Sequence, residues 1–249
     1  MNPTWKAAPV LLALACAVAP ALAQGLSPLV PPEGTPVSNW RFVGFPKSKA
    51  NIPPTRFEWA EVQGERALKV STRASYGTWV HELPKANPSR LQWRWRLDQP
   101  LSGGQGAADI LTKAGDDAAL KLCVMFDHPL NSVPFVERTL LRIARSLSGE
   151  DLPAATLCYV WDSVYMAGLQ GANPYTQRVR FITLQGKGAP LAQWQTESRD
   201  VGADFANLFS DELPAGAAVP KVRAVLIGAD SDNTGAQSLA WVQSVSWTR

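Results

Sequence analysis

The stretch LQWRWRLD, residues 91–98, alternates apolar and polar side chains without a break. Because successive side chains of an extended strand point to opposite faces, this stretch has one dry face and one wet face. The dry face holds Leu91, Trp93, Trp95 and Leu97. We expect its two tryptophans in the core, in an antiparallel sheet with one face turned to water.

Short apolar runs of the same kind, separated by proline and glycine, continue along the chain. RFEWAEV (56–62) and RALKVST (66–72) flank residues 63–65 and predict a β-hairpin. Further strands are predicted at ALKLCVMFD (119–127), TLCYVWD (156–162), VRFITLQG (179–186), AQWQTES (192–198), KVRAVLIGA (221–229) and LAWVQSVSW (239–247).

Only one stretch of the chain has a clear helical period. In PFVERTLLRIARSLSG an apolar residue recurs at spacings of three and four, at Val136, Leu140, Ile143 and Leu147. This predicts a helical insertion at about 134–148, and a shorter helix is expected at about 203–209. The fold predicted is therefore mainly β, an antiparallel β-sandwich of jelly-roll type that forms a single domain over residues 39–249.

The N-terminus has the pattern of a secretory signal peptide. Lys6 precedes an apolar run, residues 7–23, which ends in the small-x-small pattern Ala21, Leu22, Ala23. Pro9 and Pro20 interrupt that run, so we expect cleavage near Ala23 and no membrane span in the mature chain. Residues 24–38 are expected to form an irregular lead-in, and the mature protein is expected to be periplasmic or secreted.

The charge balance argues against two classes of partner. Of 24 basic residues, Lys6 leaves with the signal peptide, so 23 remain against 21 acidic ones. A chain this close to neutral gives no reason to expect nucleic acid as a partner. It also has no polybasic cluster that would hold it on an anionic membrane.

Cys123 and Cys158 are the two cysteines of the mature chain and are a candidate disulfide in an oxidising compartment. The alternative is two buried thiols on separate strands. If the two cysteines face each other across an antiparallel pair, then Leu120 faces Trp161. That register would bring Trp161 near Asp116 and Asp117.

The motifs that usually carry catalysis are absent from the sequence. It contains no G-x-S-x-G, H-E-x-x-H, C-x-x-C or P-loop pattern, and its two histidines cannot build a multi-histidine metal site. Carboxylates and loop aromatics remain, and together they suit a sugar, which binds by stacking and hydrogen bonds. The candidate ligand-binding residues are Asp116, Asp117, Trp161, Asn173 and Tyr175.

Asp230 and Asp232 match the opening half of the calcium-binding loop D-x-D-x-x-G. Trp241 stands where such a loop supplies its bidentate glutamate, and the flanking runs are predicted strands. We therefore interpret these residues as a turn between two core strands, with a structural calcium ion as the alternative. No other cofactor is expected.

Six stretches of the sequence, in the order in which they occur, resemble the bacterial exported family known as domain of unknown function 3047. They are LQWRWRLD, TKAGDDAALKLCVMFD, LLRIARSLSGEDLPAATLCYVWD, NPYTQRVRFITLQG, WQTESRDVGADFANLF and ADSDNTGAQSLAW. The resemblance covers most of residues 40–249 and implies export and a β-rich fold. It assigns no catalytic residues. Family members tend to have Tyr-Gly-Asp-Ile after the last stretch, whereas this chain has WVQSV at 241–245.

Two functions from different classes follow from these residues. The first is a non-catalytic binding module for a glycan or another component of the cell envelope. The second is a carboxylate-dependent hydrolase or lyase that acts on envelope polysaccharide. We rank binding first because the sequence shows no dedicated base or nucleophile. A structural envelope protein is a third interpretation, and the oligomeric state is left open.

Overall fold

The computed structural model describes residues 25–32, 39–45, 51–148 and 151–248. The predicted signal peptide and its cleavage position near Ala23 lie outside the described residues, as do residue 24 and residues 33–38 of the expected lead-in. No helix in the described ranges has the length and apolar character needed to cross a membrane.

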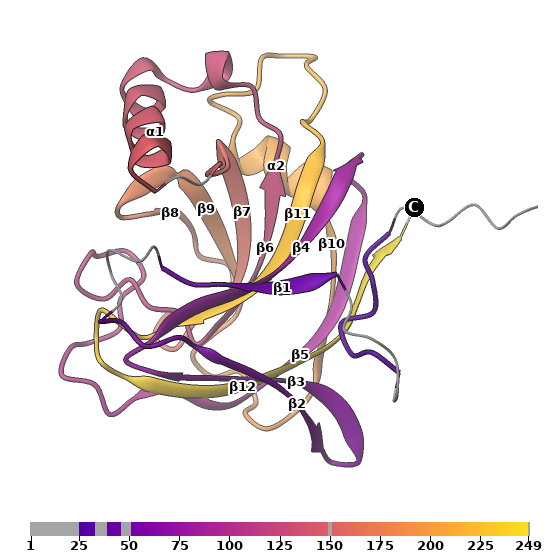
Figure 1. Cartoon of the computed structure of the whole chain (residues 1–249), viewed down its shortest axis with the longest axis vertical. Coiled ribbons are helices and arrows are strands. Elements are labelled where there is room, and N and C mark those ends of the chain that lie inside the picture. The colour runs from indigo at the N-terminus through magenta and orange to yellow at the C-terminus, as the bar shows by residue number, and fades with distance from the viewer. Residues whose placement is uncertain (1–24, 33–38, 46–50, 149–150, 249) are drawn as a thin grey trace, which may run out of the picture.

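Within the described residues, twelve strands form two sheets that pack face to face (Figure 1). The larger sheet has the order β1 (Trp40–Val43), β4 (Tyr76–Ala86), β11 (Val222–Asp230), β6 (Leu120–Phe126), β7 (Ala155–Trp161), β9 (Thr176–Gln185) and β8 (Gln170–Asn173). The smaller sheet has the order β10 (Gln195–Asp200), β5 (Arg90–Ser102), β12 (Gln237–Thr248), β3 (Glu65–Arg73) and β2 (Arg56–Val62). The predicted mainly-β sandwich is confirmed.

One strand pair departs from the predicted antiparallel pattern. Strands β7 and β9 run parallel, because β8, which lies between them in the sequence, takes the edge of the sheet. The chain leaves β7, turns back along the outside as β8, and returns as β9 beside β7.

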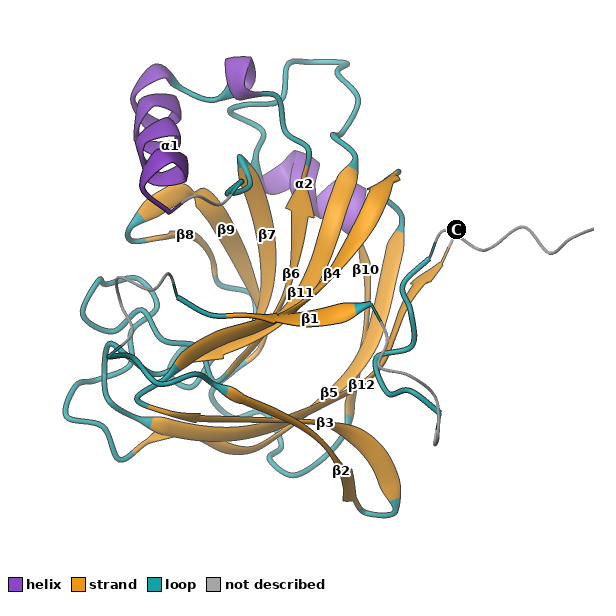
Figure 2. Cartoon of the chain, in the orientation of Figure 1, coloured by secondary structure: helices purple, strands orange, loops and turns teal. Residues whose placement is uncertain are grey.

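Both predicted helices are present, within two residues of their expected starts (Figure 2). Helix α1 spans Phe135–Ser148 and follows a short 3₁₀ turn at Leu130–Ser132. Helix α2 spans Val201–Leu208. Asp200 caps α2, because its carboxylate accepts a hydrogen bond from the Ala203 amide at 3.0 Å.

Aromatic side chains from both sheets meet in the core between them. Trp93 and Trp95 of β5 are buried, as their place on the dry face predicts. Trp93 lies 5.2 Å from the ring of Tyr159, and Trp95 lies 5.5 Å from the ring of Trp161. Each pair joins β5 to β7, so these four rings bind the two sheets together.

The hairpin predicted from residues 56–72 is formed by β2 and β3. Its turn residues Gln63 and Gly64 both have positive φ, 52° and 77°. A two-residue turn with this geometry matches the twist of the strands it joins. The two turn residues thus fix which residues of β2 and β3 face each other.

Strands β6 and β7 pair antiparallel with Cys123 opposite Cys158 and Leu120 opposite Trp161. The structure joins the two cysteines in a disulfide. Side chains alternate along both strands, so the disulfide lies on one face of the seven-stranded sheet and Trp161 on the other. We call the face that carries the disulfide, turned away from the five-stranded sheet, the outer face.

Candidate functional site

A shallow depression lies on the outer face, over β6, β7, β9 and β11. Its volume is about 30 Å³, enough for one or two water molecules. The floor is apolar, and the polar side chains that line it are Asp116, Lys121, Asn173 and Asp230. Three strands and the loop before β6 contribute these four residues, so the site depends on the tertiary fold.

Lys121 and Asp230 form the centre of the depression. In the pairing of β6 with β11, Lys121 stands opposite Gly228 and two residues from Asp230, on the same face. The Lys121 Nζ lies 2.5 Å from Asp230 Oδ2, and the Ala118 amide donates to Asp230 Oδ1 at 2.7 Å. Burial alone would lower the pKa of Lys121, but the negative charge of Asp230 outweighs it and raises that pKa. The Lys121 side chain is therefore a charged ammonium, held in place by Asp230.

Asp116, Asn173 and Tyr175 are joined by hydrogen bonds beside this pair. Asn173 donates through Nδ2 to Asp116 Oδ2 at 2.5 Å, and its Oδ1 accepts the Tyr175 amide at 2.9 Å. The Tyr175 hydroxyl donates to the Lys113 carbonyl at 2.8 Å, which fixes the other end of the ring. The Lys113 ammonium lies 5.4 Å from the centre of that ring.

Tyr175 nevertheless remains 58% exposed. The structure thus holds an aromatic ring at the surface, next to Asn173, which lines the depression. Burial raises the pKa of Asp116, against the effects of Lys121 and Asn173. We refer to Asp116, Lys121, Asn173, Tyr175 and Asp230 as the Tyr175 site.

Asp117 has a different role from the one the sequence suggested. Its buried carboxylate accepts hydrogen bonds from the amides of Asn233 and Thr234 and from the Thr234 hydroxyl. These bonds hold the turn between β11 and β12. With its oxygens engaged inside the protein, Asp117 is a structural residue and does not belong to the Tyr175 site.

Trp161 was expected to offer a stacking surface, and this expectation is wrong. Its side chain is 1% exposed and packs in the core against Trp95. The predicted register with Leu120 is correct, but Trp161 lies three residues beyond Cys158 and so points to the opposite face. The neighbouring Asp162 accepts hydrogen bonds from the amides of Val164 and Tyr165 and shapes the turn after β7.

The calcium hypothesis for Asp230 and Asp232 gains no support from the geometry. Asp230 pairs with Lys121, whose ammonium takes the place that a cation would need. Among the residues that the structure describes, no three His, Cys, Asp or Glu side chains gather as metal ligands would. The turn interpretation fits instead: Gly235 has φ of 70°, and its amide donates to the Ser231 carbonyl at 3.0 Å.

Asp232 lies in this turn, close to two other carboxylates. Burial, with the charges of Asp230 and Asp117, raises the pKa of Asp232 to about 6. A raised carboxyl pKa means that the folded protein prefers the protonated form. The cost to stability is therefore absent below pH 3.8, the ordinary value for an aspartate, and grows as the pH rises towards 6.

Replacing Asp232 with asparagine should remove this cost. We expect the variant to be more stable than the wild type by about 1 kcal/mol at pH 7.5, after allowance for solvent screening of a partly exposed group. At pH 3.5 the two proteins should unfold at the same urea concentration. Equal stability at both pH values would contradict the assignment.

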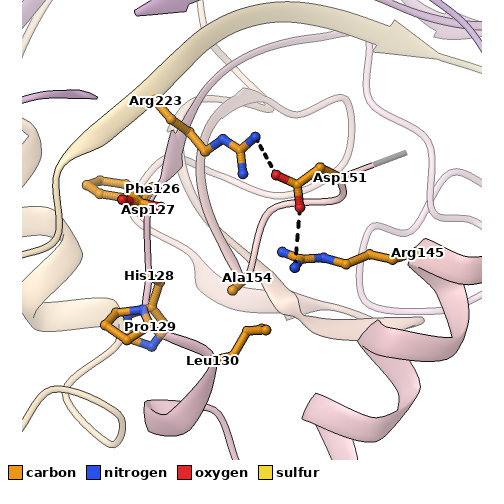
Figure 3. Close-up of a pocket in the computed structure, with 9 residues that line it drawn as sticks. All are labelled: Phe126, Asp127, His128, Pro129, Leu130, Arg145, Asp151, Ala154 and Arg223. Carbon is orange, nitrogen blue, oxygen red and sulfur yellow. Dashed lines mark ion pairs between the residues drawn. The ribbon is translucent and has the colours of Figure 1, made fainter. Parts of the chain in front are cut away.

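A second and larger cavity, of about 450 Å³, lies at the other end of the seven-stranded sheet. Figure 3 shows the guanidinium groups of Arg145 and Arg223 pointing to the same carboxylate, that of Asp151. The distances are 3.3 Å and 2.8 Å. His128 also lines this cavity, and its ring is tied to the buried Glu212. Sequence reasoning missed this cavity, since its residues come from separate strand ends and a helix.

The fold and the Tyr175 site together define a β-sandwich with a preformed polar and aromatic patch on one sheet. The chain belongs to the family described as "Protein of unknown function (DUF3047)", whose pattern matches residues 38–246. This confirms the resemblance seen in the sequence.

No curated protein matches the chain. Among solved structures it is similar to that of TmCBM61 in complex with beta-1,4-galactotriose, with 10% sequence identity and a TM-score of 0.33. That similarity covers 85% of this chain and 89% of the other. A TM-score this low carries no argument about function.

Proposed function

We propose that this protein is a non-catalytic binding module for a glycan or another envelope component, and that the Tyr175 site holds the ligand. The observation that carries the proposal is the exposed Tyr175 ring, anchored at both ends beside Asp116 and Asn173. A sugar presents an apolar C–H face and a rim of hydroxyls. The ring suits the first and the carboxylate and amide suit the second.

The shape of the site indicates how a ligand would lie. A depression of about 30 Å³ cannot enclose a sugar ring, so the ligand would rest across the surface. Such a site suits a stretch of polymer whose ends extend beyond the protein. Because Asn173 and Tyr175 are already held by hydrogen bonds, little ordering would be needed on binding.

We also propose that the chain acts in the periplasm or outside the cell, after removal of residues 1–23. The signal-peptide pattern motivates this proposal, and the disulfide between Cys123 and Cys158 supports it, since structural disulfides persist in oxidising compartments.

Replacing Tyr175 with alanine is expected to weaken glycan binding about tenfold, because the ring supplies the stacking surface, which is worth about 1 to 1.5 kcal/mol. Isothermal titration against a panel of envelope polysaccharides would measure the loss. The Tyr175→Phe variant keeps the ring and loses only the hydrogen bond to Lys113, so it should bind more tightly than Tyr175→Ala.

Leu191→Ala is the matched control for this experiment. Leu191 is a similarly exposed side chain, 45% accessible, on the loop that joins β9 to β10. Its replacement should leave the affinity unchanged. The proposal fails if no glycan in the panel binds, or if the Tyr175→Ala variant binds as tightly as the wild type.

A carboxylate-dependent hydrolase or lyase is the second candidate function. The observation that favours it is the raised pKa of Asp232. A carboxyl with a pKa of about 6 is protonated for part of the time near neutral pH, as a general acid must be. Asp117 and Asp230 suit this role less well, because each of their carboxylate oxygens already accepts a hydrogen bond from the protein. Release of reducing ends from a bound polysaccharide, lost in Asp232→Asn with binding intact, would favour the enzyme over the binding module.

A further inference from the structure

Helix α1 presents its apolar side to the solvent. The exposed fractions are 73% for Phe135, 66% for Val136, 55% for Leu140 and 51% for Ile143. Three of these residues belong to the periodic stripe seen in the sequence, and the side chain of its fourth member, Leu147, lies outside the described ones. A stripe of this kind normally faces the core of a soluble protein. Here it faces away.

The opposite side of α1 holds the helix to the protein. Leu141 is buried with Val133 and Ala154 in a small cluster of its own. Glu137 pairs with Arg178 of β9 at 3.5 Å, and Arg145 donates to the Leu152 carbonyl at 2.8 Å. In Figure 1 the helix stands at a corner of the molecule, beyond the ends of β7 and β9. These contacts fix the orientation of the stripe.

The charged residues of α1 are mostly basic. Glu137 is its only acidic residue, and that carboxylate is turned towards Arg178. Arg142 is exposed, and Arg138 is partly exposed with its guanidinium 5.7 Å from the ring of Phe135. Both arginines lie on the Phe135 side of the helix, away from Val136, Leu140 and Ile143, so positive charge borders the exposed apolar side chains at one edge only.

This combination argues against a second copy of the chain as the partner. Two such helices would each bring exposed cations and no outward acid to pair with them. The footprint is also small: 14 residues make a helix about 21 Å long and about 10 Å wide. A stable dimer buries roughly 800 Å² on each partner.

We propose that α1 is a membrane-surface helix that binds anionic lipid. The exposed apolar side chains, Phe135, Val136, Leu140 and Ile143, would lie at the boundary between headgroups and acyl chains. Arg142 and Arg138, on the Phe135 side, would face lipid phosphates at one edge. An apolar face bordered by cations is the arrangement that places a helix in the plane of such an interface. The sequence has no run of basic residues, so this charge becomes apparent only once the helix is folded and oriented. The proposal is independent of the Tyr175 site.

Co-sedimentation of the oxidised mature chain with lipid vesicles tests the proposal. The chain should bind phosphatidylcholine vesicles that contain about 30% phosphatidylglycerol and should bind pure phosphatidylcholine at least about tenfold more weakly. The double variant Val136→Ser, Ile143→Ser should reduce binding to the anionic vesicles at least about tenfold. Arg142→Gln should reduce it less, and raising the salt to about 0.5 M should weaken binding by the wild type.

The matched control is Met166→Ser, because Met166 is 72% exposed on the loop after β7 and lies outside α1. It should bind vesicles as the wild type does, and the thermal melts of all variants should coincide, since the replaced side chains face solvent. Tyr175→Ala should retain vesicle binding, which separates this result from the glycan experiment. The proposal is overturned if the wild type does not bind anionic vesicles, if the double variant binds equally well, or if the wild type is a dimer that the double variant dissociates.

Discussion

The Glu212→Gln variant is expected to be less stable than the wild type by about 3 kcal/mol at pH 7. The side chain of Glu212 is 1% exposed. Its carboxylate accepts hydrogen bonds from both Nη atoms of Arg178 and, at 2.8 Å, from Arg180 Nη2. Removing the charge leaves two arginines without this partner inside the protein. Urea unfolding at pH 7 would measure the loss.

The same residue predicts how stability changes with pH. Burial alone would raise the pKa of Glu212, but Arg178, His128 and Arg180 lower it from 4.5 to about 2. A depressed carboxyl pKa contributes stability that is complete above pH 4.5 and is lost as the pH falls towards 2. The difference between wild type and Glu212→Gln should therefore shrink at pH 3.

Glu82→Gln is the control for the buried network. Glu82 also pairs with an arginine, Arg41, at 2.6 Å, but its side chain is 69% exposed. Its replacement should change stability by less than about 1 kcal/mol. If Glu212→Gln costs no more than Glu82→Gln, or costs the same at pH 3 as at pH 7, the account of the buried network is wrong.

Replacing Trp161 with alanine is expected to cost about 3 to 5 kcal/mol of stability, because it empties the space of a fully buried indole in the core. The cavity would also remove the contact with Trp95 that links the two sheets. The midpoint of urea unfolding should fall accordingly. A loss below about 1 kcal/mol would contradict the buried position of Trp161.

The Trp161→Phe variant separates this structural role from ligand binding. It keeps a ring in the core, so it should fold, and its glycan affinity should stay close to that of the wild type. Tyr175→Ala should show the reverse pattern, with stability retained and affinity lost. A folded Trp161→Phe protein that no longer binds glycan would show that Trp161 contributes to ligand binding after all.

The elements of the fold could largely be predicted because their signals are local. Alternation over Leu91–Leu97 and the turn at Gln63 and Gly64 each depend on neighbouring residues only. The parallel pairing of β7 and β9 could not be predicted, since it requires β8 to take the sheet edge. The same holds for the outward stripe of α1: the spacing of Val136, Leu140 and Ile143 predicts a helix, and only its contacts decide which side is buried.

The candidate site was predicted in part. Asp116, Asn173 and Tyr175 do come together, although 57 residues separate the first two. Strand alternation alone placed Trp161 opposite the disulfide face, and this signal was available in the sequence. Lys121 was missed because its role depends on Asp230, which reaches it only when β11 lies beside β6. Such contacts between distant strands are set by the sheet order.

Mapping the bound ligand by amide chemical shifts tests the central claim most directly. With a glycan that binds in the titration panel added to saturation, the largest shifts should fall in residues 111–118 and 171–176, around Asp116 and Tyr175. Shifts should be small at residues 127–130 and at Arg223, which line the larger cavity. If the largest shifts occur at that cavity or on the five-stranded sheet, the Tyr175 site is not where the protein binds.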